Sequence, residues 1–413
     1  MLEEEEAVAV ARDEQRRGPA LFVTSRTLSI IGDMAAVTAL SVYVYETFGS
    51  ATLVSGIFVV RVLPRLLGPL AGALADRYDL RTLLVVCDVA ACALFACVAV
   101  FLPSYWTLLA LLLVAESVAT VSLPAARTWL ARRVDADRRG RINGVLTASV
   151  SIGFGVGAGI GGLSASALGP RLALLLNALT FAASAVLVWA AGSVPAPRSQ
   201  GERPEPLLSS ALAGTHLIVV DRRLAALALG LVGIGLASSI DRPAVVALTQ
   251  QDLPGDGGAY GLLLALISVG VLVASLAIGR VPWLGPTWNV FVVSIALQMA
   301  AHFLLGLAPS LVIAATTALM MGVGNGLESV AATTLLQNTA PATQVGTVMA
   351  AVISATFVAD AVGSLIGGFL VDTIGARPVF AVAAFIMACC GAFAWNVHRR
   401  STRLVAAPGE ELR

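Results

Sequence analysis

Three ionisable side chains lie deep inside long apolar segments, where an ionised group is costly and therefore a functional candidate by default. Asp33 and Glu116 each lie roughly 11 or 12 residues from one end of their segments, and Arg61 lies about 10 residues from an end of its own. At a rise of about 1.5 Å per helical residue, all three reach the middle of a bilayer. A carboxylate at this depth can take up a proton from one side of a membrane and release it to the other.

Two interpretations of these residues remain open. In the first, Asp33 and Glu116 carry a coupling proton or contact a substrate, and their proton affinity depends on desolvation and on the distance to Arg61. In the second, Arg61 forms a permanent ion pair with one of the two acids and only holds helices together. Arg65 lies nearer the end of its segment and is a candidate for a gate instead.

The composition places these residues in a membrane protein. The chain has 413 residues, of which 58% are hydrophobic and 12% are charged, with a mean hydropathy of +0.88, whereas soluble domains are about 25% charged. Uncharged runs long enough for a membrane helix recur, and the alternating pattern of a β-barrel is missing. The net charge of +1 gives no reason to expect a nucleic-acid partner. The chain has no Lys, so it cannot supply the lysine of the phosphate-binding loop of an ATP-driven pump.

We therefore predict an all-α membrane protein with twelve transmembrane helices, with the lipid bilayer as its environment. Turn residues and charges divide the chain into six candidate spans in each half. The predicted spans are 21–48, 51–75, 81–102, 105–131, 141–168, 171–192, 224–250, 257–279, 286–307, 309–337, 345–371 and 376–397.

The distribution of Arg predicts the orientation. Arg residues gather before the first span, after the last, and in every second loop, and cytoplasmic loops are the ones enriched in positive charge. Both termini are therefore expected in the cytoplasm, in a multi-pass protein of the cell membrane. The predicted parts are an N-terminal tail (1–20), a six-helix half (21–192), a cytoplasmic linker rich in Pro (193–222), a second six-helix half (223–397) and a C-terminal tail (398–413).

The two halves are related by an internal repeat with an offset of 206 residues. Gly157 matches Gly363, and the pair Gly161-Gly162 matches Gly367-Gly368, in a register that holds over about 70 residues. Parallel repeats of six helices are typical of transporters with a substrate site near the middle of the membrane.

The stretch GALADRYDLR resembles the loop signature of the major facilitator superfamily, through Gly72, Asp76, Arg77 and Arg81. The resemblance implies two six-helix halves related by a pseudo-twofold axis. It also implies that this loop is a cytoplasmic gate, with Asp88 and Arg127 near it as gating or anchoring contacts. Asp79 and Leu80 depart from the usual pattern, as in the branch of drug and metabolite exporters.

A glycine-rich segment resembles the antiporter motif of the same superfamily, with Ala158 in place of its Pro. Its small residues also have a plain physical function, because they let membrane helices approach closely. The segment matches a dinucleotide-binding pattern as well, but the strand and the downstream acid that such a site needs are missing. We therefore expect helix packing at Gly153, Gly157, Gly161 and Gly162.

Ionisable residues of the second half fall toward the outer side. Asp241, Arg242 and Asp360 are candidates for an outer gate, and Asp360 is also a candidate for a second proton site. His302 is interpreted as an interface residue rather than a proton relay.

The leading hypothesis is a secondary transporter that exports an amphiphilic small molecule in exchange for protons. An importer of a small polar metabolite and a lipid-handling transporter are the alternatives. The three His residues are dispersed, which argues against a hydrolytic enzyme, and the five Cys lie inside predicted spans as small hydrophobic residues. We expect no metal, no cofactor and a monomer.

Overall fold

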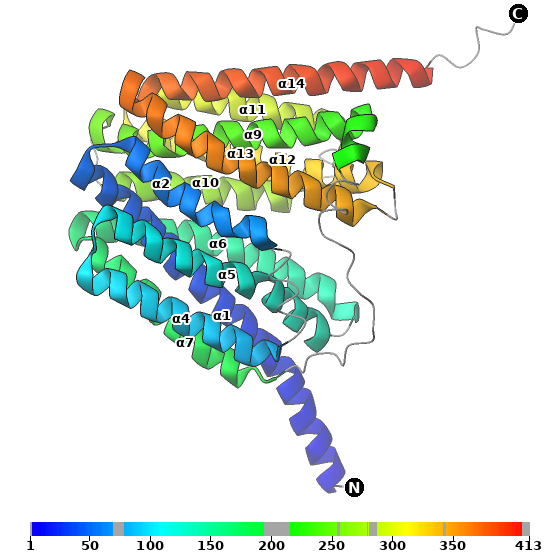
Figure 1. The fold of residues 1–413 in the computed structure, drawn as a ribbon. Helices are drawn as coiled ribbons and strands as arrows, with labels where there is room; N and C mark the ends of the chain where they lie inside the picture. The colour runs from blue at the N-terminus through cyan, green and yellow to red at the C-terminus, as the bar shows by residue number, and fades with distance from the viewer. Residues whose placement is uncertain are drawn as a thin grey trace, which may run out of the picture. The chain divides into compact units, whose positions relative to one another are not determined.

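The computed structural model describes residues 2–68, 78–134, 136–193, 215–253, 257–278, 280, 287–341 and 344–406. Every element in these ranges is helical, as predicted (Figure 1). The long α-helices are α1 (Leu2–Phe48), α4 (Leu80–Phe101), α5 (Tyr105–Arg133), α6 (Ala136–Ala167), α7 (Pro170–Ala190), α9 (Arg222–Ala247), α10 (Gly257–Ile278), α11 (Trp288–Gly306), α12 (Leu311–Thr339), α13 (Val345–Ile374) and α14 (Ala376–Ala406).

Eleven of the described helices are long and apolar enough to cross a membrane. The expected second span is described only as far as residue 68, through α2 (Ala51–Val62) and the 3-10 turn η1 (Leu63–Leu67). Pro64 lies at the start of η1, where its missing N–H removes a backbone hydrogen bond and favours the tighter turn. Helix α9 ends in the π-helical turn η2 (Leu248–Asp252).

Large apolar side chains cover much of the outside of the helices. Trp106 and Phe101 are more than 70% exposed, and many Val, Leu and Ile side chains are exposed as well. Such a surface fits the hydrocarbon core of a bilayer. Because hydrocarbon offers no hydrogen-bond partner, the backbone groups pair within each helix.

Two compact units make up the fold, and the first contains residues 1–47, 60–202 and 256–265. Within it, α4 packs along α7 and against α5 (Figure 1). Its core includes Phe22, whose ring stacks on that of Trp129 at 4.2 Å between centroids. We call this part unit 1.

The second unit, unit 2, contains residues 48–59, 203–255 and 266–413. Within it, α9 packs against α13 and α14, and α11 packs against α12 and α14 (Figure 1). Phe291 and Ile295 of α11 are fully buried in its core, with Met387 of α14. The units differ from the predicted halves in two short segments, 48–59 and 256–265.

The sequence repeat corresponds to a repeat in the packing. In unit 1, a Cβ added to Gly161 of α6 would lie 2.3 Å from the carbonyl oxygen of Ala35 in α1. In unit 2, a Cβ added to Gly367 of α13 would lie 2.0 Å from the carbonyl oxygen of Ile240 in α9. Matched glycines therefore bring matched helix pairs into backbone contact in both units, as small residues do in membrane helices.

Some predicted features lie outside the described residues. These are Gly72, Asp76 and Arg77 of the loop signature and most of the linker, 194–214. The five predicted parts of the chain, the cytoplasmic position of the termini and the cell membrane as location stay predictions.

Candidate functional site

The site in unit 1 is built from three helices that each contribute one charged side chain. Arg61 lies in the last turn of α2, two residues before η1 begins. Glu116 lies near the middle of α5. Asp33 follows Gly32 in α1, and a Cβ at Gly32 would lie 2.1 Å from Thr180 Oγ1, so the glycine lets α1 pack directly on α7 beside Asp33.

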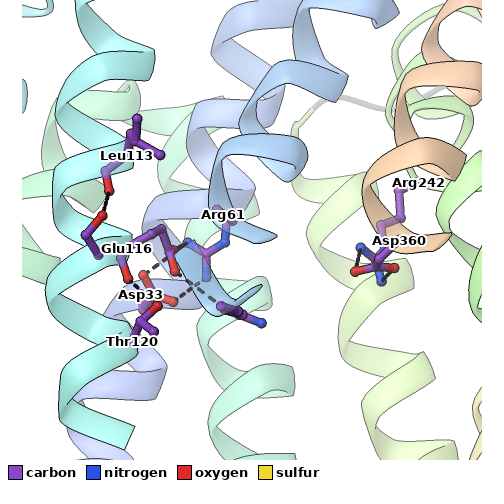
Figure 2. A network of polar contacts seen from close by, with 9 residues as sticks. Asp33, Arg61, Leu113, Glu116, Thr120, Arg242 and Asp360 are labelled. Atoms are coloured by element: carbon purple, nitrogen blue, oxygen red, sulfur yellow. Dashed lines mark hydrogen bonds and ion pairs between the residues drawn. The ribbon is translucent and has the colours of Figure 1, made fainter. Parts of the chain in front are cut away.

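The structure brings these three side chains into direct contact (Figure 2). Arg61 Nη2 donates to Asp33 Oδ2 at 2.6 Å, and Nη1 donates to Asp33 Oδ1 at 3.2 Å. The same Nη1 lies 2.8 Å from Glu116 Oε1. Two carboxylates therefore share one guanidinium.

The charges of this trio do not balance. Arg61 is 7% exposed and Glu116 is 5% exposed, so water solvates neither of them well. Two ionised carboxylates and one guanidinium carry a net charge of −1, and a buried net charge is costly. Arg65 lies 3.6 Å from Glu116 Oε2, but its side chain is 40% exposed, so solvent weakens its contribution. One proton on either acid would neutralise the trio.

A cavity of about 580 Å³ lies inside unit 1, and Asp33 is one of its lining residues. The volume falls in the range of about 300–1,000 Å³ that small-molecule sites occupy. Most of the lining is apolar and comes from α1, α4, α5, α6 and α7. Its charged members are Arg26, Asp33, Asp88 and Arg127. A molecule with a large apolar surface and a polar end matches this lining.

Asp88 forms a second buried ion pair. Its carboxylate accepts from Arg26 and, at 2.7 Å, from Ser184 Oγ, while Arg26 also donates to Ser184 Oγ at 2.6 Å. Asp88 is 1% exposed, so the pair ties α1, α4 and α7 together in the interior of the unit.

Two other residues expected at the cytoplasmic gate have different surroundings. The guanidinium of Arg81 stacks over the ring of Trp189, 4.7 Å from its centroid. Arg127 is exposed and lines the cavity. Their gating roles stay predictions.

The glycine-rich segment lies against other helices at all four expected positions. Added Cβ atoms at Gly153, Gly157 and Gly161 would come within 3 Å of α1, and one at Gly162 would come within 3 Å of the start of α10. Helix packing therefore accounts for all four glycines.

The three residues expected at the outer gate, Asp241, Arg242 and Asp360, do not form one cluster in unit 2. Arg242 and Asp360 form a two-pronged ion pair with both contacts at 2.9 Å (Figure 2), and Ser239 Oγ donates to the same carboxylate. Asp241 instead faces His302, with 2.9 Å between Oδ2 and Nε2. Their role as a gate stays a prediction.

Sequence reasoning missed Arg26, Ser184 and the pairing of Asp241 with His302. Arg26 could have been found, because it precedes Asp33 by seven residues and so shares its helix face. Ser184 and His302 carried no such signal, since their partners lie on other helices.

The comparisons with known proteins agree with this architecture. Residues 22–240 and 227–412 match the model of the Major Facilitator Superfamily. An uncharacterised transporter of this type from Bacillus subtilis (strain 168), YfiS, is 25% identical in an alignment that covers 91% of this chain and 92% of that protein.

Solved structures share the fold at low sequence identity. A bacterial homologue of the human lysosomal transporter Spinster superposes with a TM-score of 0.74 at 13% identity, covering 94% of this chain and 97% of its own. The nucleoside transporter NupG superposes with a TM-score of 0.74 at 12% identity, covering 92% and 99%. The POT family transporter PepTSo superposes with a TM-score of 0.72 at 13% identity, covering 94% of this chain and 98% of its own. The chain belongs to the Major Facilitator Superfamily and is a multi-pass membrane transporter of that type.

Proposed function

We propose that this transporter exports an amphiphilic small molecule across the cell membrane in exchange for protons. In this proposal Asp33 and Glu116 are the proton-carrying acids, and Arg61 is the cation for which they compete. The observation that carries the proposal is the shared guanidinium of Arg61, which two carboxylates contact, while the second cation near Glu116, Arg65, lies 3.6 Å away on a side chain that is 40% exposed. A bound proton relieves the competition between the two acids.

The two acids have different access to the cavity. The side chain of Asp33 is 24% exposed and lines the cavity, whereas that of Glu116 is 6% exposed. Asp33 is therefore the acid that a substrate or water in the cavity reaches first. A proton on Asp33 removes its charge, and Arg61 then pairs with Glu116 alone. Loss of that proton restores the competition, so proton binding changes the contacts among α1, α2 and α5.

The lining of the cavity supports an amphiphilic cargo. Its apolar residues would contact the apolar part of such a molecule, and its charged residues would contact the polar end. The substrate class named for one structural neighbour, the nucleoside transporter NupG, is polar, so uptake of a small polar metabolite stays the alternative.

The test measures export of a panel of fluorescent amphiphilic dyes from energised cells, with and without a protonophore. We expect the transporter to lower dye accumulation and the protonophore to abolish this effect. Asp33→Asn and Glu116→Gln should lose concentrative export. Asp252→Asn is the matched control, because it also removes a carboxylate but alters an exposed side chain at the end of η2, outside the trio.

A second measurement separates loss of coupling from loss of the fold. In proteoliposomes, exchange of labelled for unlabelled dye needs no proton gradient, and we expect Asp33→Asn and Glu116→Gln to retain it. Intact concentrative export in both variants would overturn the role of the acids. Dye accumulation that rises with the transporter would overturn the direction and favour the importer.

A further inference from the structure

A second buried pair of titratable groups lies in unit 2. Asp241 of α9 is 3% exposed and His302 of α11 is 1% exposed. Asp241 Oδ2 and His302 Nε2 are 2.9 Å apart, but their orientation is not that of a well-aligned hydrogen bond. Neither atom has another hydrogen-bond partner among the described residues.

The contacts of the imidazole ring determine where its protons lie. Nδ1 is 2.7 Å from the carbonyl oxygen of Gln298. A carbonyl oxygen only accepts hydrogen bonds, so Nδ1 carries a hydrogen and donates. Nε2 then faces Asp241 with either a hydrogen or a lone pair. If neither Nε2 nor the carboxylate held a proton, two acceptors would face each other around a buried negative charge, which is strongly unfavourable. The pair is therefore stable in the interior only with one proton between them.

The neighbouring charges do not replace that proton. Arg242, next to Asp241 in sequence, forms an ion pair with both carboxylate oxygens of Asp360 from α13. Arg377 of α14 donates to the carbonyl oxygens of Gly306 and Ala308. The other titratable groups must be counted among the side chains that the structure describes in the helices packed against α9 and α11. They are Glu328 of α12, Asp372 of α13, Cys389, Cys390 and Arg399 of α14, and Arg222, Arg223 and Asp252 at the two ends of the segment formed by α9 and η2. Glu328 is itself buried, with no hydrogen-bond partner for Oε1 in the described residues.

The matching helix contact in unit 1 does not need a buried carboxylate. Gly161 meets the carbonyl oxygen of Ala35 in α1, and its repeat partner Gly367 meets that of Ile240 in α9. Asp241 follows Ile240, so its counterpart in α1 is Ala36, which is fully buried. The carboxylate at this position is therefore an addition specific to unit 2.

We propose that Asp241 and His302 together form a second proton-binding site. The pair holds one proton while it is buried and releases it when water reaches the two side chains. The site goes beyond the proposed function, since it depends neither on Asp33 and Glu116 nor on the identity of the cargo. The proposal gives His302 a role in proton binding in addition to that of an interface residue.

The protein offers a direct reporter for this site, because it contains only three His residues. His216→Gln and His398→Gln together leave His302 as the single imidazole in the full chain. Labelling with ¹⁵N-histidine and solid-state NMR in lipid bilayers then report the protonation of both ring nitrogens. We expect Nδ1 to be protonated throughout, and Nε2 to carry or share a proton from about pH 6 to well above the range in which a free imidazole, with its pKa of about 6.5, has become neutral.

Two comparisons decide between a proton site and a merely structural contact. At higher pH the Nε2 proton should be lost reversibly while circular dichroism shows an intact helical fold. Asp241→Asn should convert His302 to the neutral form with Nδ1 protonated over the same range, Asp241→Glu should retain the proton, and Asp33→Asn should change nothing. The inference is overturned if Nε2 titrates like a free imidazole, if Asp241→Asn has no effect, or if the proton is lost only on unfolding. None of these results depends on dye export, so they are separate from the test of the proposed function.

Discussion

The contact between α6 and α1 makes a quantitative prediction, because one helix carries both a crowded and an uncrowded glycine. A Cβ at Gly161 would lie 2.3 Å from the carbonyl oxygen of Ala35, whereas a Cβ at Gly159 would meet nothing within 4 Å. Gly161→Ala and Gly159→Ala therefore add the same methyl group to the same helix in two environments.

The size of the effect follows from the distances. Ordinary contacts of this kind begin at 3.4 Å, so Gly161→Ala requires α6 and α1 to separate by about 1 Å. Overpacking of this kind costs about 1–3 kcal/mol, and the better helix propensity of Ala offsets about 1 kcal/mol of it. We expect Gly161→Ala to lower the free energy of unfolding by about 1 kcal/mol and Gly159→Ala to raise it by up to about 1 kcal/mol.

The assay is equilibrium unfolding in mixed micelles, with increasing sodium dodecyl sulfate and circular dichroism as the signal. The quantity compared is the difference between the two variants, which cancels the shared change in propensity. Equal effects of Gly161→Ala and Gly159→Ala would refute the conclusion that this segment serves close helix packing.

Further predictions concern unfolding by the same assay. Arg26→Gln leaves the buried Asp88 without its cation and should destabilise the fold by about 3–5 kcal/mol, while the double variant with Asp88→Asn should recover most of the loss. Asp372→Ala removes a carboxylate that accepts from the first backbone N–H groups of α2 and should cost about 1 kcal/mol. Gly367→Ala should resemble Gly161→Ala, because its Cβ would meet the backbone at 2.0 Å. An unchanged midpoint in any of the single variants would contradict the corresponding contact.

Much of the fold could be predicted because it depends on local properties of the sequence. The length of an apolar run sets the length of a membrane helix, and the structure places helix ends within a few residues of most predicted spans. The glycine register also predicted which positions make close contacts, since only glycine permits them at Gly157 and Gly161.

The site was only partly predictable, because depth and direction are separate properties of a side chain. Depth follows from counting residues, and it placed Asp33, Arg61 and Glu116 at one level. Direction around the helix axis depends on which helices are neighbours, so the sequence could not show that Asp241 faces His302 rather than Arg242 and Asp360.

The repeat also indicates why the proposed coupling chemistry belongs to unit 1. With the offset of 206 residues, Arg61 corresponds to Ile267 and Glu116 corresponds to Gly322. These two positions touch in unit 2 as well, where a Cβ at Gly322 would lie 2.0 Å from the carbonyl oxygen of Ile267. The same helix crossing thus holds a buried ion pair in unit 1 and a close glycine contact in unit 2. Since the glycine contact is sufficient for packing, the ion pair in unit 1 needs another reason, and the excess carboxylate beside it is consistent with proton binding.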